Sequence, residues 1–445
     1  MQRDRLPCWL CFLVVTLALA GLFLVPLAQA QGDTAIQVVT STARAEFPAR
    51  ISFALEAESR AADIVAVQLL YGATRQQVLT VVDLEVAPRQ RVSLQHELDT
   101  QVFYYPPGTA ISYRWWIRDA AGNEVTTPLA EVRYHDERFP WLERSARNVT
   151  IYWYGGGEAF GETLLGAAVR ALDRLEAVLG AGLEQPVEIY IYASNSDMRS
   201  ALQANSVEWV GGEAHTELGV IIGAIEPGDR TEAGRLIPHE LSHQVLAQLT
   251  ANPYGGVPLW FDEGLAMYAQ EQRDAGYDER LAAAARAGRL IPLEALAASF
   301  PADTDQALLS YAQSRAVVAY LIERYGVEQV RELALAFATA MPVNEALLAV
   351  LGRSVDALDA EWRATLPPAD QVLVATPAPQ QAPPERFAEA PPASPAGPEA
   401  GSWFTRLPPW ALLAGAGVCC SAATLVVIVV VLVGLRFLGV DQGTA

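Results

Sequence analysis

The stretch that decides the fold of this chain is Leu236-Ile237-Pro238-His239-Glu240-Leu241-Ser242-His243-Gln244-Val245-Leu246. Its apolar residues recur at helical spacing, which predicts a helix. Pro238 fits this helix if the helix begins close by, because a proline in the first turn loses no hydrogen bond. At 3.6 residues per turn, His239 and His243 lie one above the other on one face. Two imidazoles on one face can share a metal ion, and Glu240, offset by about 100°, stands beside that ion without binding it.

A third ligand is expected downstream, because catalytic zinc takes three protein ligands and keeps one position open. The segment Pro258-Leu259-Trp260-Phe261-Asp262-Glu263-Gly264-Leu265-Ala266 follows a turn. Proline is favoured at the first helical position, so the segment predicts a second helix with Glu263 one turn in. Gly264 and Ala266 are small, so the backbones of the two helices can approach and bring the Glu263 carboxylate to the ion.

These two motifs resemble those of the gluzincin metallopeptidases, the group of thermolysin and the aminopeptidase N relatives. His239-Glu240-x-x-His243, with Glu263 in a Trp260-x-x-Glu-Gly-x-Ala setting, looks most like the peptidase MA-like domains. The resemblance covers residues 148–340. It implies an α+β zincin catalytic domain that holds Zn²⁺ on His239, His243 and Glu263. It also implies that Glu240 is the catalytic base, which takes a proton from water and passes it to the leaving amine.

Gluzincins usually add a tyrosine or histidine that donates to the developing oxyanion. Residues 309–314 open a predicted helix that ends at Tyr325 and resemble the family's downstream helix, so Tyr311 is the candidate donor. The alternative is a buried tyrosine that only packs this helix. His215 is the second candidate, and an exposed loop histidine is its alternative.

The sequence departs from its better-known relatives in two places. Thermolysin-like enzymes have an aspartate four residues after the ligand glutamate that supports a zinc histidine, and Met267 stands there in this chain. The aminopeptidases have a Gly-x-Met-Glu-Asn segment that holds the substrate amine, and this chain offers Gly211-Gly212-Glu213-Ala214. An endopeptidase is therefore favoured, and an aminopeptidase with Glu213 as amine anchor remains the alternative.

The first domain is predicted at residues 31–137 as an all-β sandwich. Short alternating runs separated by turn residues are typical of antiparallel strands. They comprise residues 36–39, 50–55, 64–70, 78–84, 91–94, 110–117 and 131–134. Tyr113-Arg114-Trp115-Trp116-Ile117-Arg118-Asp119 loosely resembles a late strand of immunoglobulin-like domains. Such a domain serves as a spacer, or docks a protein partner or substrate.

The metallopeptidase domain is predicted at residues 138–366. Residues 149–154, 187–192 and 219–223 read as strands, and residues 162–179 as an amphipathic helix. From Thr231 to Leu366 the pattern is almost wholly helical. We expect the site in the cleft between the sheet-bearing half and the helical half.

The two ends of the chain predict export and tethering. Residues 1–30 read as a signal peptide that ends in Ala28-Gln29-Ala30. Residues 367–409, rich in proline and alanine, predict an unfolded stalk. Residues 410–436 predict one transmembrane helix, because the uncharged run within them is long enough to cross about 30 Å of hydrocarbon. Residues 437–445 form a short cytoplasmic tail, so the protein is expected in the cell membrane with its N-terminal domains outside.

Composition narrows the chemistry further. The four cysteines all lie in the predicted signal peptide and membrane helix, which excludes a disulfide scaffold and a thiolate site in the exported part. The formal net charge of −20 argues against nucleic acid as a partner. The expected partners are a peptide or protein substrate and the membrane. The rival class is a non-catalytic surface protein that uses a peptidase fold for adhesion or sensing.

Overall fold

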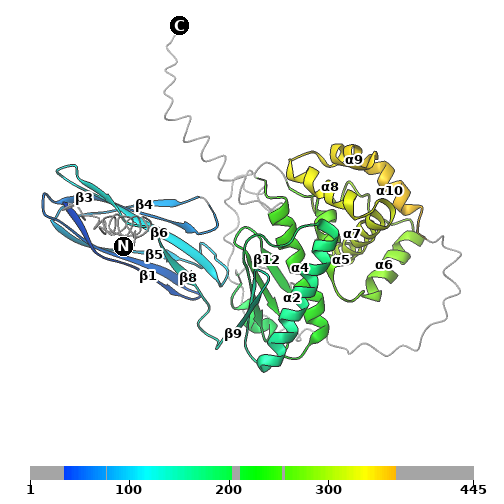
Figure 1. Cartoon of the computed structure of the whole chain (residues 1–445), viewed down its shortest axis with the longest axis horizontal. Coiled ribbons are helices and arrows are strands. Elements are labelled where there is room, and N and C mark those ends of the chain that lie inside the picture. The colour runs from blue at the N-terminus through cyan, green and yellow to red at the C-terminus, as the bar shows by residue number, and fades with distance from the viewer. Residues whose placement is uncertain (1–34, 77, 203–210, 253–255, 367–445) are drawn as a thin grey trace, which may run out of the picture. The chain divides into compact units, whose positions relative to one another are not determined.

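The computed structural model describes residues 35–76, 78–202, 211–252 and 256–366 (Figure 1). The predicted signal peptide, stalk, membrane helix and cytoplasmic tail lie outside these residues. Among the described helices, none combines the length and the apolar character that a membrane span needs.

The N-terminal part consists of two antiparallel sheets, as the alternation predicts. One sheet has the order β1-β2-β5; the other has the order β4-β3-β6-β7, with β8 also paired to β6. The bounds are β1 Ile36–Glu46, β2 Arg50–Ser59, β3 Ile64–Ala73, β4 Thr80–Leu84, β5 Arg91–Asp99, β6 Thr109–Asp119, β7 Glu124–Thr126 and β8 Ala130–Tyr134. Side chains of both sheets, such as Phe53 of β2 and Trp115 of β6, share one core. The predicted sandwich strands are present, and the three-residue β7 was not predicted.

A second sheet-bearing unit follows, with the strand order β12-β13-β11-β10-β9. Its strands are β9 Leu142–Ala146, β10 Val149–Trp153, β11 Val187–Tyr192, β12 Gly212–His215 and β13 Val220–Ala224. The three central strands are parallel, and the two outer ones pair antiparallel to their neighbours. β12 is therefore the edge strand within the described residues, next to β13.

The helices pack mainly on one face of this sheet. They are α2 Gly157–Leu179, α3 Asn195–Arg199, α4 Arg230–Leu249, α5 Leu259–Ala269, α6 Ala275–Arg286, α7 Thr304–Tyr325, α8 Val327–Ala338, α9 Val343–Leu351 and α10 Val355–Arg363. α2 and α4 pack side by side against the sheet, and α5 lies between α4 and α7 (Figure 1). Their apolar side chains form one core with the inner faces of β10, β11 and β13. The sheet-bearing half and the helical half agree with the predicted α+β domain.

Gly264 packs against α7, whereas its small size suggested a close contact with the helix that carries the histidines. A Cβ atom on Gly264 would stand 2.4 Å from the Ser314 carbonyl oxygen and 2.7 Å from the Val318 side chain of α7. Such distances are far inside van der Waals contact, so only glycine fits here. The close backbone approach is therefore between α5 and α7, and not between α5 and α4.

Candidate metal centre

The helix that carries the histidines begins earlier than Pro238 indicated. α4 starts at Arg230, where the Asp229 side chain accepts a hydrogen bond from the Glu232 backbone at 2.9 Å. Pro238 therefore lies in the helix interior and cannot donate to the Gly234 carbonyl oxygen. That oxygen instead accepts the backbone N–H of Glu271 at 2.9 Å. The proline thus leaves an acceptor that ties the end of α5 to the middle of α4.

The three predicted ligands come together as expected. One donor atom from each of His239, His243 and Glu263 lies within 4.8 Å of the others. The Glu263 Oε2 atom is 3.4 Å from His239 Nε2 and 3.8 Å from His243 Nε2. The three side chains are only 14–15% exposed. Two imidazole nitrogens and one carboxylate oxygen converge at one point, and they come from two helices.

The remaining nitrogen of each imidazole has its own partner. His243 Nδ1 is 2.6 Å from Asp262 Oδ1, and His239 Nδ1 is 3.1 Å from the Gln270 side-chain amide. A histidine that binds a metal through Nε2 carries its proton on Nδ1 and needs an acceptor there. The Asp262 carboxylate is such an acceptor, and the Gln270 amide becomes one when its oxygen and nitrogen exchange places. Both histidines are thereby oriented with Nε2 toward Glu263.

These residues fit a zinc ion. Glu263 Oε2 is buried and has no hydrogen-bond partner within the described residues, although a buried carboxylate oxygen needs one. A cation between Nε2 of His239, Nε2 of His243 and this oxygen supplies that partner. Two imidazoles and one carboxylate, with a fourth position left open, form the donor set of catalytic zinc sites.

Asp262 and Gln270 were not predicted from the sequence. The family pattern pointed to position 267, where Met267 instead packs near the Gln270 amide, with its sulfur 3.2 Å from the amide nitrogen. Asp262 directly precedes the ligand Glu263, and neighbours in a helix project about 100° apart. The position of Asp262 directly before Glu263 was the only feature of the sequence that could have indicated a partner for His243.

Glu240 lies beside the donors without joining them. The residue is buried, with 8% of its surface exposed. Its Oε1 atom would stand 3.0 Å from a Cβ on Gly212, so the carboxylate lies under the start of β12. Burial raises the pKa of Glu240, and the positive charges of His239 and His243 oppose the rise. A carboxyl group with a raised pKa is suited to take up and release a proton near neutral pH.

Tyr311 also lies near the cluster. α7 begins at Thr304, so Tyr311 is in the interior of this helix and not at its start. Burial raises the pKa of Tyr311, and the negative charges of Glu263 and Glu240 add to the rise, which places the phenol within electrostatic range of both carboxylates. Its ring contacts Phe300 edge-on, with 5.1 Å between centroids. The phenol is therefore placed near the site, and its catalytic role stays a prediction.

The other oxyanion candidate lies on a different face of the sheet. His215 and Glu213 pair with Val220 and Ile222, which belong to the core on the side of the sheet away from α4. Burial lowers the pKa of His215 to about 4, so the ring is neutral at pH 7. Its Nε2 atom is 3.7 Å from the Glu213 carboxylate. Neither residue belongs to the donor cluster, and the amine-anchor role of Glu213 stays a prediction.

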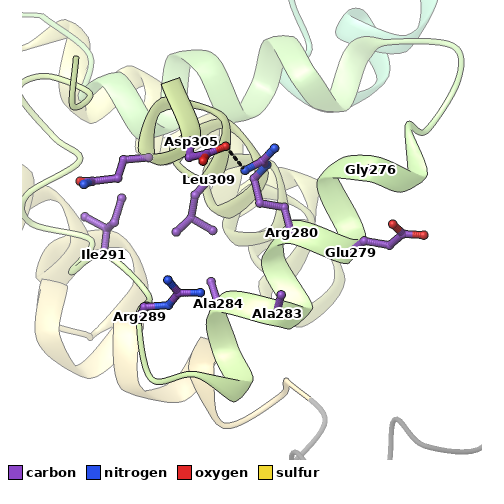
Figure 2. Close-up of a pocket in the computed structure, with 10 residues that line it drawn as sticks. Gly276, Glu279, Arg280, Ala283, Ala284, Arg289, Ile291, Asp305 and Leu309 are labelled. Carbon is purple, nitrogen blue, oxygen red and sulfur yellow. Dashed lines mark hydrogen bonds and ion pairs between the residues drawn. The ribbon is translucent and has the colours of Figure 1, made fainter. Parts of the chain in front are cut away.

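One cavity in the described residues lies away from the donors. It has a volume of about 780 Å³ and is lined by α6, α7 and the segment around Ile291. Figure 2 shows Arg280 reaching toward Asp305 there, at 2.7 Å. A smaller cavity of about 340 Å³ has His243 and Asp262 in its wall. This smaller cavity therefore borders the Nδ1 side of His243, where Asp262 lies, and no predicted site residue lines the 780 Å³ cavity.

Removal of the Asp262 carboxylate tests the support of the metal site. We expect the purified protein to bind about one zinc per chain. Asp262→Ala should weaken zinc binding by about 10- to 100-fold, because the His243 ring loses the acceptor that fixes its orientation. Competition with a fluorescent chelator measures the affinity. Asp173→Ala, which removes an exposed aspartate of α2, is the control. Wild-type affinity in Asp262→Ala, or zinc retained by a His239→Ala, His243→Ala double variant, would contradict the assignment.

We next compare the chain with protein families and with solved structures. Residues 167–367 match the Peptidase MA superfamily. No curated protein matches the chain. Among solved structures, the M1 zinc metallopeptidase from Deinococcus radiodurans is similar at 14% identity over 74% of this chain and 92% of that chain, with a TM-score of 0.35. An aminopeptidase N family protein from Idiomarina loihiensis is similar at 10% identity over 73% of this chain and 70% of that chain, with a TM-score of 0.32.

OgpA from Akkermansia muciniphila is similar at 8% identity over 23% of this chain, with a TM-score of 0.20. The chain spans only 30% of the length of that protein. Likenesses of this size carry no argument about activity, so the sequence match and the geometry of the donors decide the assignment. The match to the Peptidase MA superfamily over residues 167–367 contains His239, Glu240, His243 and Glu263, and it supports a gluzincin-like zinc peptidase.

Proposed function

We propose that this protein is a zinc-dependent peptidase that hydrolyses peptide bonds with a metal-activated water, and that it acts as an endopeptidase. The observation that carries the proposal is the convergence of His239, His243 and Glu263 beside the buried carboxylate of Glu240. A structural zinc site is closed by a fourth protein ligand, whereas this cluster has three donors and an acid–base group next to them. That combination suits hydrolysis.

The residues of the chain divide the reaction between them. Zinc, when bound, polarises the scissile carbonyl and makes water more acidic. Glu240 accepts the proton of the attacking water and delivers it to the leaving amine nitrogen. Tyr311 donates its phenolic hydrogen to the oxyanion that develops in the transition state. Within the described residues β12 is the edge strand, and its outer backbone N–H and C=O groups can pair with an extended peptide as a further strand.

The placement of Glu213 supports an endopeptidase. An aminopeptidase needs a carboxylate that holds the free amine in front of the metal. Ala214, and not Glu213, projects from β12 toward the helical core, while Glu213 lies beside His215 on the other face. The β12 edge is therefore available for a chain that continues past the cleavage site in both directions. Release of internal fragments from an unfolded protein, as opposed to stepwise loss of N-terminal residues, is the measurement that separates the two activities.

Glu240→Gln separates metal binding from chemistry. The amide cannot accept the proton of water, so we expect zinc content to stay near one per chain and peptide hydrolysis to fall by at least about 100-fold. Zinc analysis and turnover of a fluorogenic peptide measure the two effects. Glu162→Gln, an exposed residue of α2, is the matched control. Near-normal turnover in Glu240→Gln would remove this residue from the base role. No turnover by the zinc-loaded wild type would favour a non-catalytic surface protein.

Tyr311→Phe tests the oxyanion donor. Loss of one hydrogen bond made only in the transition state should lower kcat by about 10- to 1000-fold, with KM, zinc content and thermal stability nearly unchanged. Tyr320→Phe on the same helix should leave kcat unchanged. If the Tyr311 ring only packs against Phe300, Tyr311→Phe will be silent and Tyr311→Ala will lower the melting temperature; the donor must then be sought elsewhere, beginning with His215.

We propose further that the peptidase is exported and held at the cell membrane by one C-terminal helix. The proposal is supported by the signal-like residues 1–30 and by the uncharged run within residues 410–436. External protease added to intact cells should cut within residues 367–409 and release a soluble, zinc-binding fragment, detected by immunoblot of the supernatant. Protection of this segment until the membrane is breached would invert the topology.

A further inference from the structure

Arg235 lies on the metal face of α4. It precedes His239 by four residues and His243 by eight, and residues at this spacing project from the same side of a helix. Its neighbours Gly234 and Leu236 are buried, whereas the Arg235 side chain is 45% exposed. The partly exposed guanidinium therefore projects from the same side of α4 as the ligands, one turn before His239.

Glu232 holds this guanidinium in a fixed direction. Arg235 Nε donates to Oε2 at 2.8 Å, and Nη2 donates to Oε1 at 2.5 Å. These two bonds use one edge of the planar group and leave the edge between Nη1 and Nη2 with an N–H on each nitrogen. A second carboxylate can dock on that edge in the two-bond geometry that arginine favours. Among the described residues, only Glu232 makes hydrogen bonds with this guanidinium, and it leaves the second edge available.

Two further groups border the same space. A Cβ atom on Gly211, directly before the edge strand β12, would stand 3.2 Å from Arg235 Nη2. Tyr277 of α6 is within electrostatic range: burial raises the pKa of its phenol, and the positive charge of Arg235 opposes that rise. The guanidinium therefore lies next to the start of β12, where a peptide that pairs with β12 would pass.

The chemistry of Glu240 gives the direction of that peptide. This carboxylate delivers its proton to the leaving nitrogen, so the part of the substrate on the C-terminal side of the scissile bond lies on the Glu240 side of the donors. Glu240 Oε1 faces Gly212, and the charge of Glu240 acts on Arg235. Residues that follow the cleaved bond consequently run past Gly212 and Gly211 toward Arg235.

We propose that Arg235, oriented by Glu232, binds a carboxylate on the C-terminal side of the scissile bond and makes the enzyme selective for substrates that carry one there. This inference rests on the proposed peptidase function and names its substrate class. The carboxylate has two possible sources, an aspartate or glutamate side chain and the C-terminus of the peptide. Both present the same planar pair of oxygens to the free edge of the guanidinium.

Four peptides of one sequence distinguish the sources. They carry Glu or Gln at the second position after the cleaved bond, each with a free or an amidated C-terminus. A hydrogen-bonded charge pair of this kind should raise kcat/KM by about 10- to 100-fold over the neutral peptide. If kcat/KM is higher for the Glu peptides than for the Gln peptides, Arg235 binds the acidic side chain. If kcat/KM is higher for the peptides with a free C-terminus than for the amidated ones, Arg235 binds the C-terminal carboxylate. Equal kcat/KM for all four peptides would overturn the proposal.

For each Arg235 variant we compare kcat/KM for the acidic peptide with kcat/KM for the neutral peptide. The ratio of the two values does not depend on the overall activity of the variant. Arg235→Gln should bring the ratio close to one. Arg235→Glu should reverse the preference, so that a peptide with Lys at the recognised position becomes the better substrate; a merely structural role of Arg235 does not produce this reversal. Arg91→Gln, an exposed arginine of β5, removes the same charge elsewhere and should keep the wild-type ratio. An unchanged ratio in Arg235→Gln would overturn the proposal.

A binding measurement separates this inference from the proposed function. Fluorescence anisotropy of labelled acidic and neutral peptides on zinc-loaded Glu240→Gln protein reads recognition without turnover. Tighter binding of the acidic peptide, lost on adding Arg235→Gln, supports the role of Arg235 even if the wild type hydrolyses nothing. Equal affinity for both peptides, or binding of neither, overturns it even if the wild type is an active peptidase.

Discussion

The attachment of α5 to α4 is the constraint on which the site depends. Pro238 has no N–H to give to Gly234, and the freed carbonyl oxygen accepts the backbone of Glu271 just beyond the end of α5. The start of α5 is fixed as well, because the Leu259 and Trp260 backbones donate to Ala297 and Leu296 at 2.9 and 3.1 Å. A short helix held at both ends presents its residues to α4 in one register. That register places Glu263 opposite the two histidines.

The same register places a partner on each histidine. Asp262, one residue before the ligand glutamate, meets His243, and Gln270, just after α5, meets His239. Glu240, Asp262 and Glu263 thus bring three carboxylates close to two imidazoles in a buried space, an arrangement that like-charge repulsion opposes. Without a metal, the charge of Asp262 raises the pKa of His243 despite burial. A divalent cation removes the need for that proton and gives the buried Glu263 oxygen its partner, so the donor arrangement favours the metal-loaded form.

The sequence predicts the ligands because their spacing is local, and it misses what depends on contacts between distant segments. His239 and His243 share a face for reasons of helical period alone, and Glu263 follows from its own motif. The start of α4 at Arg230 agrees with the helical pattern that begins at Thr231, but the interior position of Pro238 depends on the Glu271 backbone, which satisfies the carbonyl that the proline leaves open. β12 is only four residues long and carries no alternating pattern, so its place at the sheet edge comes from pairing with β13. Gln270 meets His239 only because both ends of α5 are fixed.

The contact at Gly264 also fixes the position of the Tyr311 phenol. Because Gly264 has no side chain, the backbone of α5 lies directly against Ser314 of α7. Glu263 directly precedes Gly264, and Tyr311 stands three residues, about one helical turn, before Ser314. One tight backbone contact therefore sets the position of the phenol relative to the ligand carboxylate. A larger residue at Gly264 would move α7 away and separate Tyr311 from the place where the oxyanion forms, while His239 and His243 would keep their shared face of α4. The metal-binding residues and the Tyr311 phenol are thus held by different contacts, and α5 is the element that takes part in both.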